Sequence, residues 1–294
     1  MQGKLPPRLG IVILIIVASC FAANHLSARI AFDHGASVGA AVAVRASFTA
    51  LFLVFLLAVK KIPFALPAGT RGWALLAGVL IAVQSYCLYS AVAIIPPALA
   101  LLVFQTSPMF YVLLTWAFGK QPPRPAALAP MVLALAGLAL ALGIHTGQLE
   151  ARWSEIGVGV SWAFASGVSM ALVYYINTNA LAALDGRLRT LVMTAVTAVI
   201  VIVAAGSAGA MRLPADGIGV AGLVSLTAFY CTAMISLFAV LPRVPAASTA
   251  ALNFEPIALL GLAWVFLDQR VSAVQLAGAL LTVGAIAWLG AMKK

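Results

Sequence analysis

Ten apolar stretches follow one another along the chain, and connections of only a few residues separate them. They cover residues 9–31, 37–59, 72–94, 98–118, 125–144, 155–177, 188–210, 217–240, 246–267 and 272–291. A helix needs about 20 apolar residues to cross the hydrocarbon core of a bilayer. Each stretch reaches this length, so the sequence predicts ten transmembrane helices with little protein outside the lipid.

The composition supports this class of protein, since 64% of the residues are apolar and only 8% are charged. A soluble domain of this size needs more polar surface to cover its exterior. Open strands would leave backbone groups unpaired in lipid, and apolar runs such as 11–18 and 192–205 lack the alternation of a membrane barrel. We therefore expect an all-α membrane protein.

The net charge of +10 is unevenly distributed over the connections. If the N-terminus is cytoplasmic, twelve basic residues face the cytoplasm: Lys4, Arg8, Lys60, Lys61, Arg71, Lys120, Arg124, Arg187, Arg189, Arg243, Lys293 and Lys294. Three lie on the opposite side, namely Arg152, Arg212 and Arg270. This asymmetry follows the positive-inside rule and predicts that both termini are cytoplasmic. The basic charge is then a consequence of topology, and we expect no nucleic-acid partner.

The start of the chain, Met1–Ala23, has the basic residues and apolar run of a signal peptide. The apolar stretch continues beyond the region where cleavage would occur, so we interpret it as the first transmembrane helix. The three cysteines and three histidines are scattered, without the spacing of a disulfide framework or a metal site. We expect neither a metal nor a cofactor.

The two halves of the sequence resemble each other when the first is shifted by 148 positions. Pro97 then falls on Pro245, Pro108 on Pro256, and Trp116 on Trp264. We therefore divide the chain into two repeats of five helices, residues 1–148 and 149–294. Five is an odd number, so the second repeat must cross the membrane in the opposite sense. Inverted repeats with a site at their interface are typical of transporters.

This organisation resembles the drug/metabolite transporter superfamily in its EamA-type branch. The supporting segment runs from Pro245 to Gly290 and contains the Glu255-Pro256 pair, Trp264 and Gln275-Leu-Ala-Gly278. The first repeat departs from the pattern, with Ser107-Pro108 in place of the Glu-Pro pair. The resemblance implies a secondary transporter, and within the superfamily we expect the amino-acid exporter branch, which includes aromatic amino-acid exporters. We accordingly expect a multi-pass protein of the bacterial inner membrane.

Glu255 lies at the middle of the ninth predicted span, where a charge costs a few kcal/mol unless it faces a cavity or a partner. It could bind an ammonium group, carry a coupled proton, or form a buried ion pair that locks two helices. Arg45 is the possible charge partner, about 12 Å inside the second span. Arg45 could instead bind a substrate carboxylate or reach the interface by snorkelling.

Polar and aromatic residues at bilayer depth predict one central cavity with aromatic walls. The candidate substrate-binding residues are Asn24, His25, Gln84, Tyr86, Tyr89, Gln105, Trp162, Ser166, Tyr230, Asn253 and Glu255. The alternative is that Ser and His side chains make interhelical hydrogen bonds and that aromatic residues belong to an interfacial belt. Four prolines are candidate hinges, or simple helix breakers: Pro97, Pro108, Pro245 and Pro256.

These features favour an exporter of small metabolites, most of all neutral or aromatic amino acids, that works by alternating access around a midplane site. A multidrug or lipophilic-cation efflux transporter is the alternative, because Glu255 and aromatic walls would also suit a cation. An intramembrane enzyme is disfavoured, because no nucleophile and base converge. The expected partners are a small-molecule substrate and the lipid bilayer, and the chain would be a monomer or a homodimer.

Overall fold

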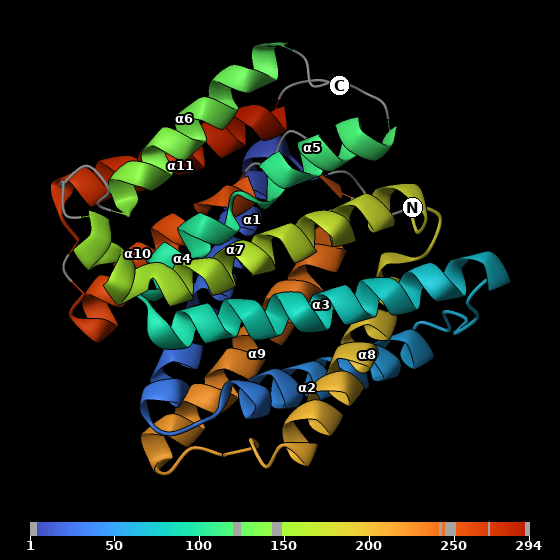
Figure 1. Cartoon of the computed structure of the whole chain (residues 1–294). Helices are drawn as coiled ribbons and strands as arrows, with labels where there is room; N and C mark the ends of the chain where they lie inside the picture. The colour runs from blue at the N-terminus through green and yellow to red at the C-terminus, as the bar shows by residue number, and fades with distance from the viewer. Residues whose placement is uncertain are drawn as a thin grey trace.

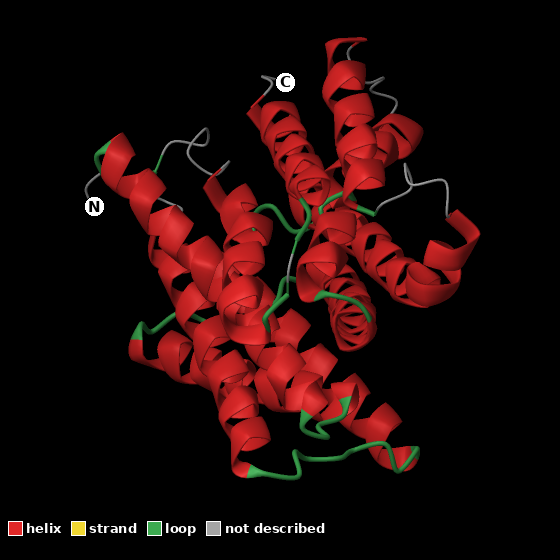
Figure 2. Ribbon diagram, turned by 90° about the vertical axis from the view of Figure 1, so that its left-hand side faces the viewer, coloured by secondary structure: helices red, strands yellow, loops and turns green. Residues whose placement is uncertain are grey.

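The computed structural model describes residues 5–119, 125–142, 149–240, 243–244, 251–269 and 271–291. Within these ranges the regular structure is helical, which confirms the predicted class, and no strand is formed. The helices are α1 (Pro7–Asp33), α2 (Val38–Val59), α3 (Ala68–Ile94), α4 (Pro97–Phe104), α5 (Ser107–Gly119), α6 (Pro125–Ala141), α7 (Leu149–Asn179), α8 (Gly186–Ser207), α9 (Gly217–Val240), α10 (Glu255–Leu267) and α11 (Ala273–Ala291). Figure 2 shows them as rods joined by short loops.

The helix lengths confirm seven of the ten predicted spans within the described residues. Over the described residues, seven helical segments are long and apolar enough to cross a membrane, with α4 and α5 counted as one segment. Three shorter apolar helices are α6, α11 and residues 251–267, which comprise α10 and a preceding 3₁₀ turn. Large apolar side chains such as Leu51, Phe55 and Val203 are exposed along the outer faces. This pattern suits helices that have lipid as their solvent.

Two predicted spans differ from uninterrupted helices. The fourth is divided into α4 and α5 at Gln105 and Thr106, and α10 begins only at Glu255. Pro108 and Pro256 are each the second residue of the helix after the break. A proline at this position needs no hydrogen-bond donor, because the first N–H groups of a helix have no partner within it. The two prolines therefore begin half-helices instead of bending continuous ones.

Helices from the first half of the chain pack against helices from the second half. The main pairs are α1 with α9, α3 with α7, α2 with α8, and α6 with α11. In Figure 1, α2 and α8 lie together at one edge, α6 and α11 at the opposite edge, and α3 and α7 run between them. The core of the molecule thus lies at the junction of the two halves.

The α2–α8 pair illustrates the antiparallel sense of this packing. Gly39, near the start of α2, lies against Ala205, near the end of α8. Leu57, near the end of α2, packs in one buried cluster with Leu188, near the start of α8. The helices α2 and α8 therefore run in opposite directions.

The α6–α11 pair depends on a close backbone approach at two glycines. A Cβ atom on Gly137 would lie 2.6 Å from Thr282 Oγ1 and 2.7 Å from the carbonyl oxygen of Gly278. A Cβ atom on Gly278 would lie 2.6 Å from the backbone nitrogen of Ala141. Because backbone atoms cannot rotate away, only glycine allows this approach.

The helix bounds repeat along the chain with the shift that aligned the sequence. The helix α5 spans 107–119 and α10 spans 255–267, so both ends differ by 148 residues. The helices α6 and α11 begin at 125 and 273, which also differ by 148. Thr282 and Ala134, which share a hydrogen bond between these helices, are separated by 148 residues as well.

Candidate functional site

A hydrogen-bonded group at the junction of α1, α3 and α9 holds two fully buried polar side chains. The Asn24 amide nitrogen donates to the carbonyl oxygen of Leu226 at 2.7 Å. The same nitrogen lies 3.0 Å from the Tyr89 hydroxyl, which can in turn donate to the Asn24 carbonyl oxygen at 3.1 Å. Both side chains are 0% exposed, so this group fixes the position of the Tyr89 ring.

Arg45, on α2, extends its guanidinium towards the Tyr89 ring. Its side chain donates from Nη2 to Ser85 Oγ at 2.8 Å. The Cζ atom lies 4.8 Å from the centre of the Tyr89 ring and 4.2 Å from that of Tyr230, which are cation–π distances. Arg45 is only 7% exposed, and its Nε is buried without a hydrogen-bond partner. The cation is thus held by neutral groups.

The polar contacts continue from α3 to α7. Ser85 Oγ donates to the Gln84 side-chain oxygen at 3.2 Å, and the Gln84 amide nitrogen donates to Ser166 Oγ at 3.2 Å. Ser166 Oγ donates to the Gln84 backbone carbonyl at 3.0 Å. A continuous polar path therefore runs from Arg45 on α2 to Ser166 on α7, through the interior of the protein.

His25 and Glu255 form the second charged element of this region. His25 Nε2 lies 3.3 Å from Glu255 Oε1, and the His25 ring meets the Tyr89 ring edge to face at 5.8 Å between centroids. The other ring nitrogen of His25 is buried and has no partner. Arg45 does not pair with Glu255, because His25 on α1 lies between α10 and the Tyr89 ring.

Thr49 and Cys231 border this central cluster. Thr49 Oγ1 donates to the Arg45 carbonyl oxygen at 2.7 Å and lies 3.3 Å from Cys231 Sγ. We define the central cluster as Asn24, His25, Arg45, Gln84, Ser85, Tyr89, Ser166, Tyr230 and Glu255. Among the described residues, no group of three or more His, Cys, Asp or Glu side chains is arranged to hold a metal ion.

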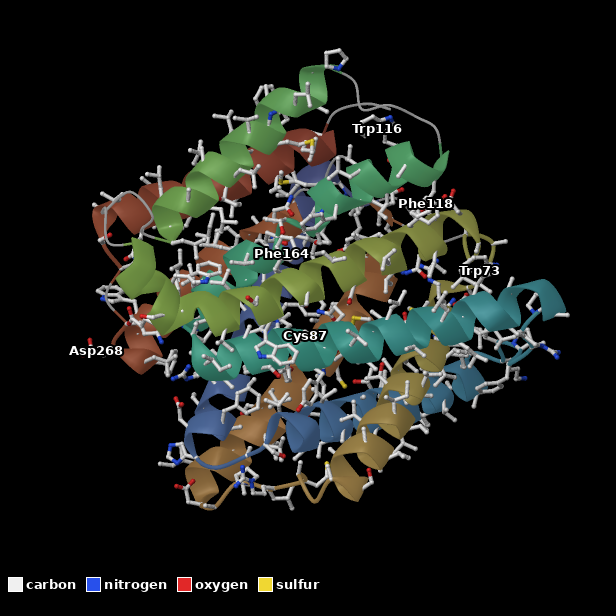
Figure 3. The ribbon with its side chains drawn as sticks, in the orientation of Figure 1. Trp73, Cys87, Trp116, Phe118, Phe164 and Asp268 are labelled. Atoms are coloured by element: carbon white, nitrogen blue, oxygen red, sulfur yellow. The ribbon has the colours of Figure 1, made fainter. Side chains whose placement is uncertain are left out.

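Tyr86 and Trp162 lie apart from the central cluster. Their rings meet edge to face at 6.4 Å between centroids and are 40% and 37% exposed. Both line a cavity of about 750 Å³ whose other walls come from α1, α2, α3 and α8. Cys87, labelled in Figure 3, borders the same cavity. The aromatic residues predicted for one cavity are thus divided between an interior cluster and a lateral cavity.

The remaining predicted residues lie at the two helix interruptions. Gln105 caps the end of α4, and Asn253 lies in the 3₁₀ turn that precedes α10; both are half-buried. Pro97 is the first residue of α4. Pro245 lies outside the described residues.

Ser85, in the central cluster, and Thr49, at its border, are absent from the predicted binding set. A signal for Ser85 existed, since Ser85 and Tyr89 are four residues apart and share a helix face. Thr49 is likewise four residues from Arg45. Neither spacing alone distinguishes a cluster residue from a threonine or serine that bonds only to its own helix.

Comparison with known proteins adds a family and a fold. The model of the EamA-like transporter family matches residues 8–143, which span α1 to α6. A solved structure described only as "Crystal structure of protein" superposes with a TM-score of 0.62, covering 97% of this chain and 98% of its own, at 18% identity. Similarity at that identity concerns the fold. No curated protein matches the chain.

Proposed function

We propose that the chain is a multi-pass membrane transporter of small molecules that exports neutral or aromatic amino acids, a proposal supported by the match of residues 8–143 to the EamA-like transporter family. The observation that carries this proposal is the central cluster. It holds a buried cation and a partly buried carboxylate inside a protein with an apolar exterior. Charged side chains at membrane depth are costly and mark substrate pathways.

We further propose that the chain consists of two inverted repeats with both termini in the cytoplasm, in the bacterial inner membrane, as a monomer or homodimer. The 148-residue shift between helix bounds supports the repeats. Exchanging the halves converts the α1–α9 pair into the α7–α3 pair, and both pairs occur. The basic residues Lys60, Lys61 and Arg187 lie at the end of the molecule where α2 ends and α8 begins, as the positive-inside rule requires of a cytoplasmic side.

The central cluster suits a substrate that carries an ammonium group and an aromatic side chain. An ammonium group that reaches Glu255 replaces His25 as the partner of the carboxylate. The half-buried Tyr230 ring, beside Arg45, offers an aromatic surface to an aromatic side chain. The half-helices α5 and α10 begin beside this region, and tilting them about Pro108 and Pro256 opens one side or the other.

A lipophilic-cation efflux transporter is the second candidate function. The lateral cavity beside Tyr86 and Trp162 has mainly apolar walls and a volume of about 750 Å³, which is within the usual range for a drug-sized ligand. Aromatic faces attract cations as well as neutral rings. The two functions differ in the ligand that exchanges across the membrane.

Counterflow in proteoliposomes tests the proposal. Vesicles loaded with L-phenylalanine, L-leucine, a sugar phosphate or a cationic dye are assayed for uptake of the labelled compound. We expect exchange of the amino acids, and loss of at least 90% of it in Glu255→Gln (an order-of-magnitude expectation for a lost charged contact). Asp268→Asn is the matched control, because Asp268 is an exposed carboxylate in the turn after α10 and should exchange normally.

Two outcomes would contradict the proposal. Exchange of the cationic dye without amino acids would establish the second candidate function. Wild-type exchange in a folded Glu255→Gln variant would remove Glu255 from the transport site. In Figure 3, Asp268 lies at the periphery, so equal loss in both variants would indicate a general effect of the lost charge.

A further inference from the structure

Arg45 is a buried cation to which the described residues offer no counter-charge. It is 7% exposed, and its side-chain partners, the Ser85 hydroxyl at 2.8 Å and Tyr89, are neutral. Four described carboxylates pair with groups other than Arg45: Asp33 with Arg29, Asp185 with Arg187, Asp216 with His34, and Glu255 with His25. A buried charge normally has a paired, hydrogen-bonded partner. Arg45 lacks one in this structure.

The geometry of the Arg45 guanidinium matches that of a carboxylate-binding site. A guanidinium has five N–H donors in a planar fork, and Nη2 donates to Ser85 Oγ. Nε is buried and unpaired. A carboxylate binds such a fork with two parallel hydrogen bonds, one of which Nε can donate. The orphaned nitrogen therefore indicates an anion that the free protein lacks.

The guanidinium is also held in place before a ligand arrives. It lies against the rings of Tyr89 and Tyr230. Tyr89 is fixed by Asn24, and the Tyr230 ring packs edge to face on Phe21 at 5.9 Å between centroids. Fixed geometry reduces the entropy lost on binding and raises affinity for a matching ligand. These contacts therefore hold the Arg45 guanidinium in a fixed orientation in which it can donate hydrogen bonds to a ligand.

We propose that Arg45 binds the carboxylate of the transported molecule, so that the substrates of this protein are carboxylates or zwitterions. This inference rests on the proposed transport function and assigns the residue that binds the substrate carboxylate. One guanidinium balances one negative charge, which suits a carboxylate better than a phosphate with a charge near −2. An uncompensated cation at the centre also repels lipophilic cations, which separates this substrate class from the second candidate function.

The position of Arg45 relative to Glu255 constrains the substrate further. Arg45 and His25 both contact the Tyr89 ring, and His25 is in turn the partner of Glu255. The carboxylate site and the Glu255 carboxylate are therefore separated by the Tyr89 and His25 side chains. An α-amino acid carries its ammonium group beside its carboxylate, so a molecule bound at Arg45 does not contact Glu255 at the same time.

The test compares acids with their amides in thermal melts of the purified protein. The pairs are L-phenylalanine with L-phenylalaninamide, benzoate with benzamide, and acetate with acetamide, at equal ionic strength. We expect at least one acid to raise Tm where its amide does not, and we expect Arg45→Met to abolish that difference. Arg29→Met is the matched control, because Arg29 is already paired with Asp33, and it should preserve the difference.

The ligand-free Met variant gives a second, independent readout. Removing an uncompensated buried charge should leave Tm unchanged or raise it, since the apolar Met fills similar space without a desolvation cost. A Met variant that fails to fold, or melts below the wild type, would identify Arg45 as a structural cation and overturn the proposal. Absence of any acid–amide difference in the wild-type protein would overturn it as well.

Counterflow separates this inference from the transport proposal. We expect Arg45→Lys to lose about tenfold or more in apparent affinity for the exchanged acid, because an ammonium cannot form the two parallel bonds. Exchange of cationic dyes alone would overturn the carboxylate site while transport stands. Acid-specific stabilisation through Arg45, without exchange of any tested compound, would preserve the site while transport fails.

Discussion

The buried Asn24–Tyr89 pair links three helices with few atoms. Asn24 contacts the Tyr89 hydroxyl on α3 and the Leu226 carbonyl on α9, and each contact is inaccessible to water. A buried polar group left without its partner loses more free energy than a hydrogen bond contributes on average. Asn24 therefore acts on stability and, through Tyr89, on the orientation of the Arg45 guanidinium.

We predict that Asn24→Ala lowers the free energy of unfolding by about 1–3 kcal/mol, because the Tyr89 hydroxyl and the Leu226 carbonyl lose a partner. Ser19→Ala is the control on the same helix, since Ser19 bonds only to the Ile15 carbonyl one turn away. Thermal melts in detergent measure both. Equal shifts in the two variants would mean that the Asn24 contacts add nothing beyond a local bond.

At the residue scale, sequence reasoning identified most cluster members but not their partners. The i, i+3 spacing predicts that Tyr86 and Tyr89 share one face of their helix. The structure buries Tyr89 completely and leaves Tyr86 40% exposed beside Trp162. Which helix covers each face depends on tertiary packing, and that is absent from the local pattern. For the same reason, sequence spacing alone could not reveal His25 as the partner of Glu255.

The helices α6 and α11 approach each other closely because glycines at their contact leave room for the backbone of the neighbouring helix. Gly137 faces Thr282 and the Gly278 carbonyl, whereas Gly284, also on α11, has nothing near its missing Cβ. The same substitution should therefore have opposite effects at the two positions.

We predict that Gly137→Ala destabilises the protein by about 1–3 kcal/mol, the usual cost of overpacking. Gly284→Ala should stabilise it by up to about 1 kcal/mol, because alanine is the better helix former. Chemical or thermal unfolding of the two variants gives the comparison. A Gly137→Ala protein as stable as the Gly284→Ala protein would rule out the close approach of α6 and α11.

Element boundaries were largely predictable because the bilayer fixes helix length. The predicted span 188–210 corresponds to α8, and 217–240 matches α9. The interruption between α4 and α5 was not predicted as two helices, although Pro108 was identified as a hinge candidate. Hydropathy cannot detect such a break, because residues on both sides of it are equally apolar.

At the scale of the whole molecule, the proposed membrane topology fixes which end of each helix faces the cytoplasm. We predict that Lys61→Cys is labelled by an impermeant thiol reagent from the cytoplasmic side, and Arg212→Cys from the opposite side. Cys20, Cys87 and Cys231 are replaced by alanine in both proteins. The α2–α8 packing places these two positions at opposite ends of the molecule. Labelling of both from one side would contradict the proposed topology.

The pairing of helices across the two halves could not be predicted from hydropathy. In lipid, a lipid-facing surface and a helix-facing surface are both apolar, so hydrophobic periodicity does not distinguish them. On the long helix α3, which contacts α7 and α8, Ala74 and Ala77 are buried, whereas the equally apolar Leu75, Leu76 and Val79 are exposed. The internal repeat was the better guide, because the 148-residue shift reappears in the helix bounds.

The accessibility of Cys231 tests the central claim, namely that the buried cluster is a transport site reached alternately from the two sides of the membrane. Cys231 lies beside Thr49 at the edge of the cluster, so a protein that keeps only this cysteine leaves the Arg45 contacts intact. A second protein that keeps only Cys87 reports the lateral cavity. Each is treated with a small impermeant thiol reagent from either side of sealed vesicles.

We predict that Cys231 reacts from both sides, and that L-phenylalanine slows both reactions while the reaction of Cys87 is unaffected. Modification of Cys231 from one side only, or at a rate indifferent to L-phenylalanine and to every other compound that the protein exchanges, would contradict the account. The central cluster would then be part of the packed core instead of a substrate pathway.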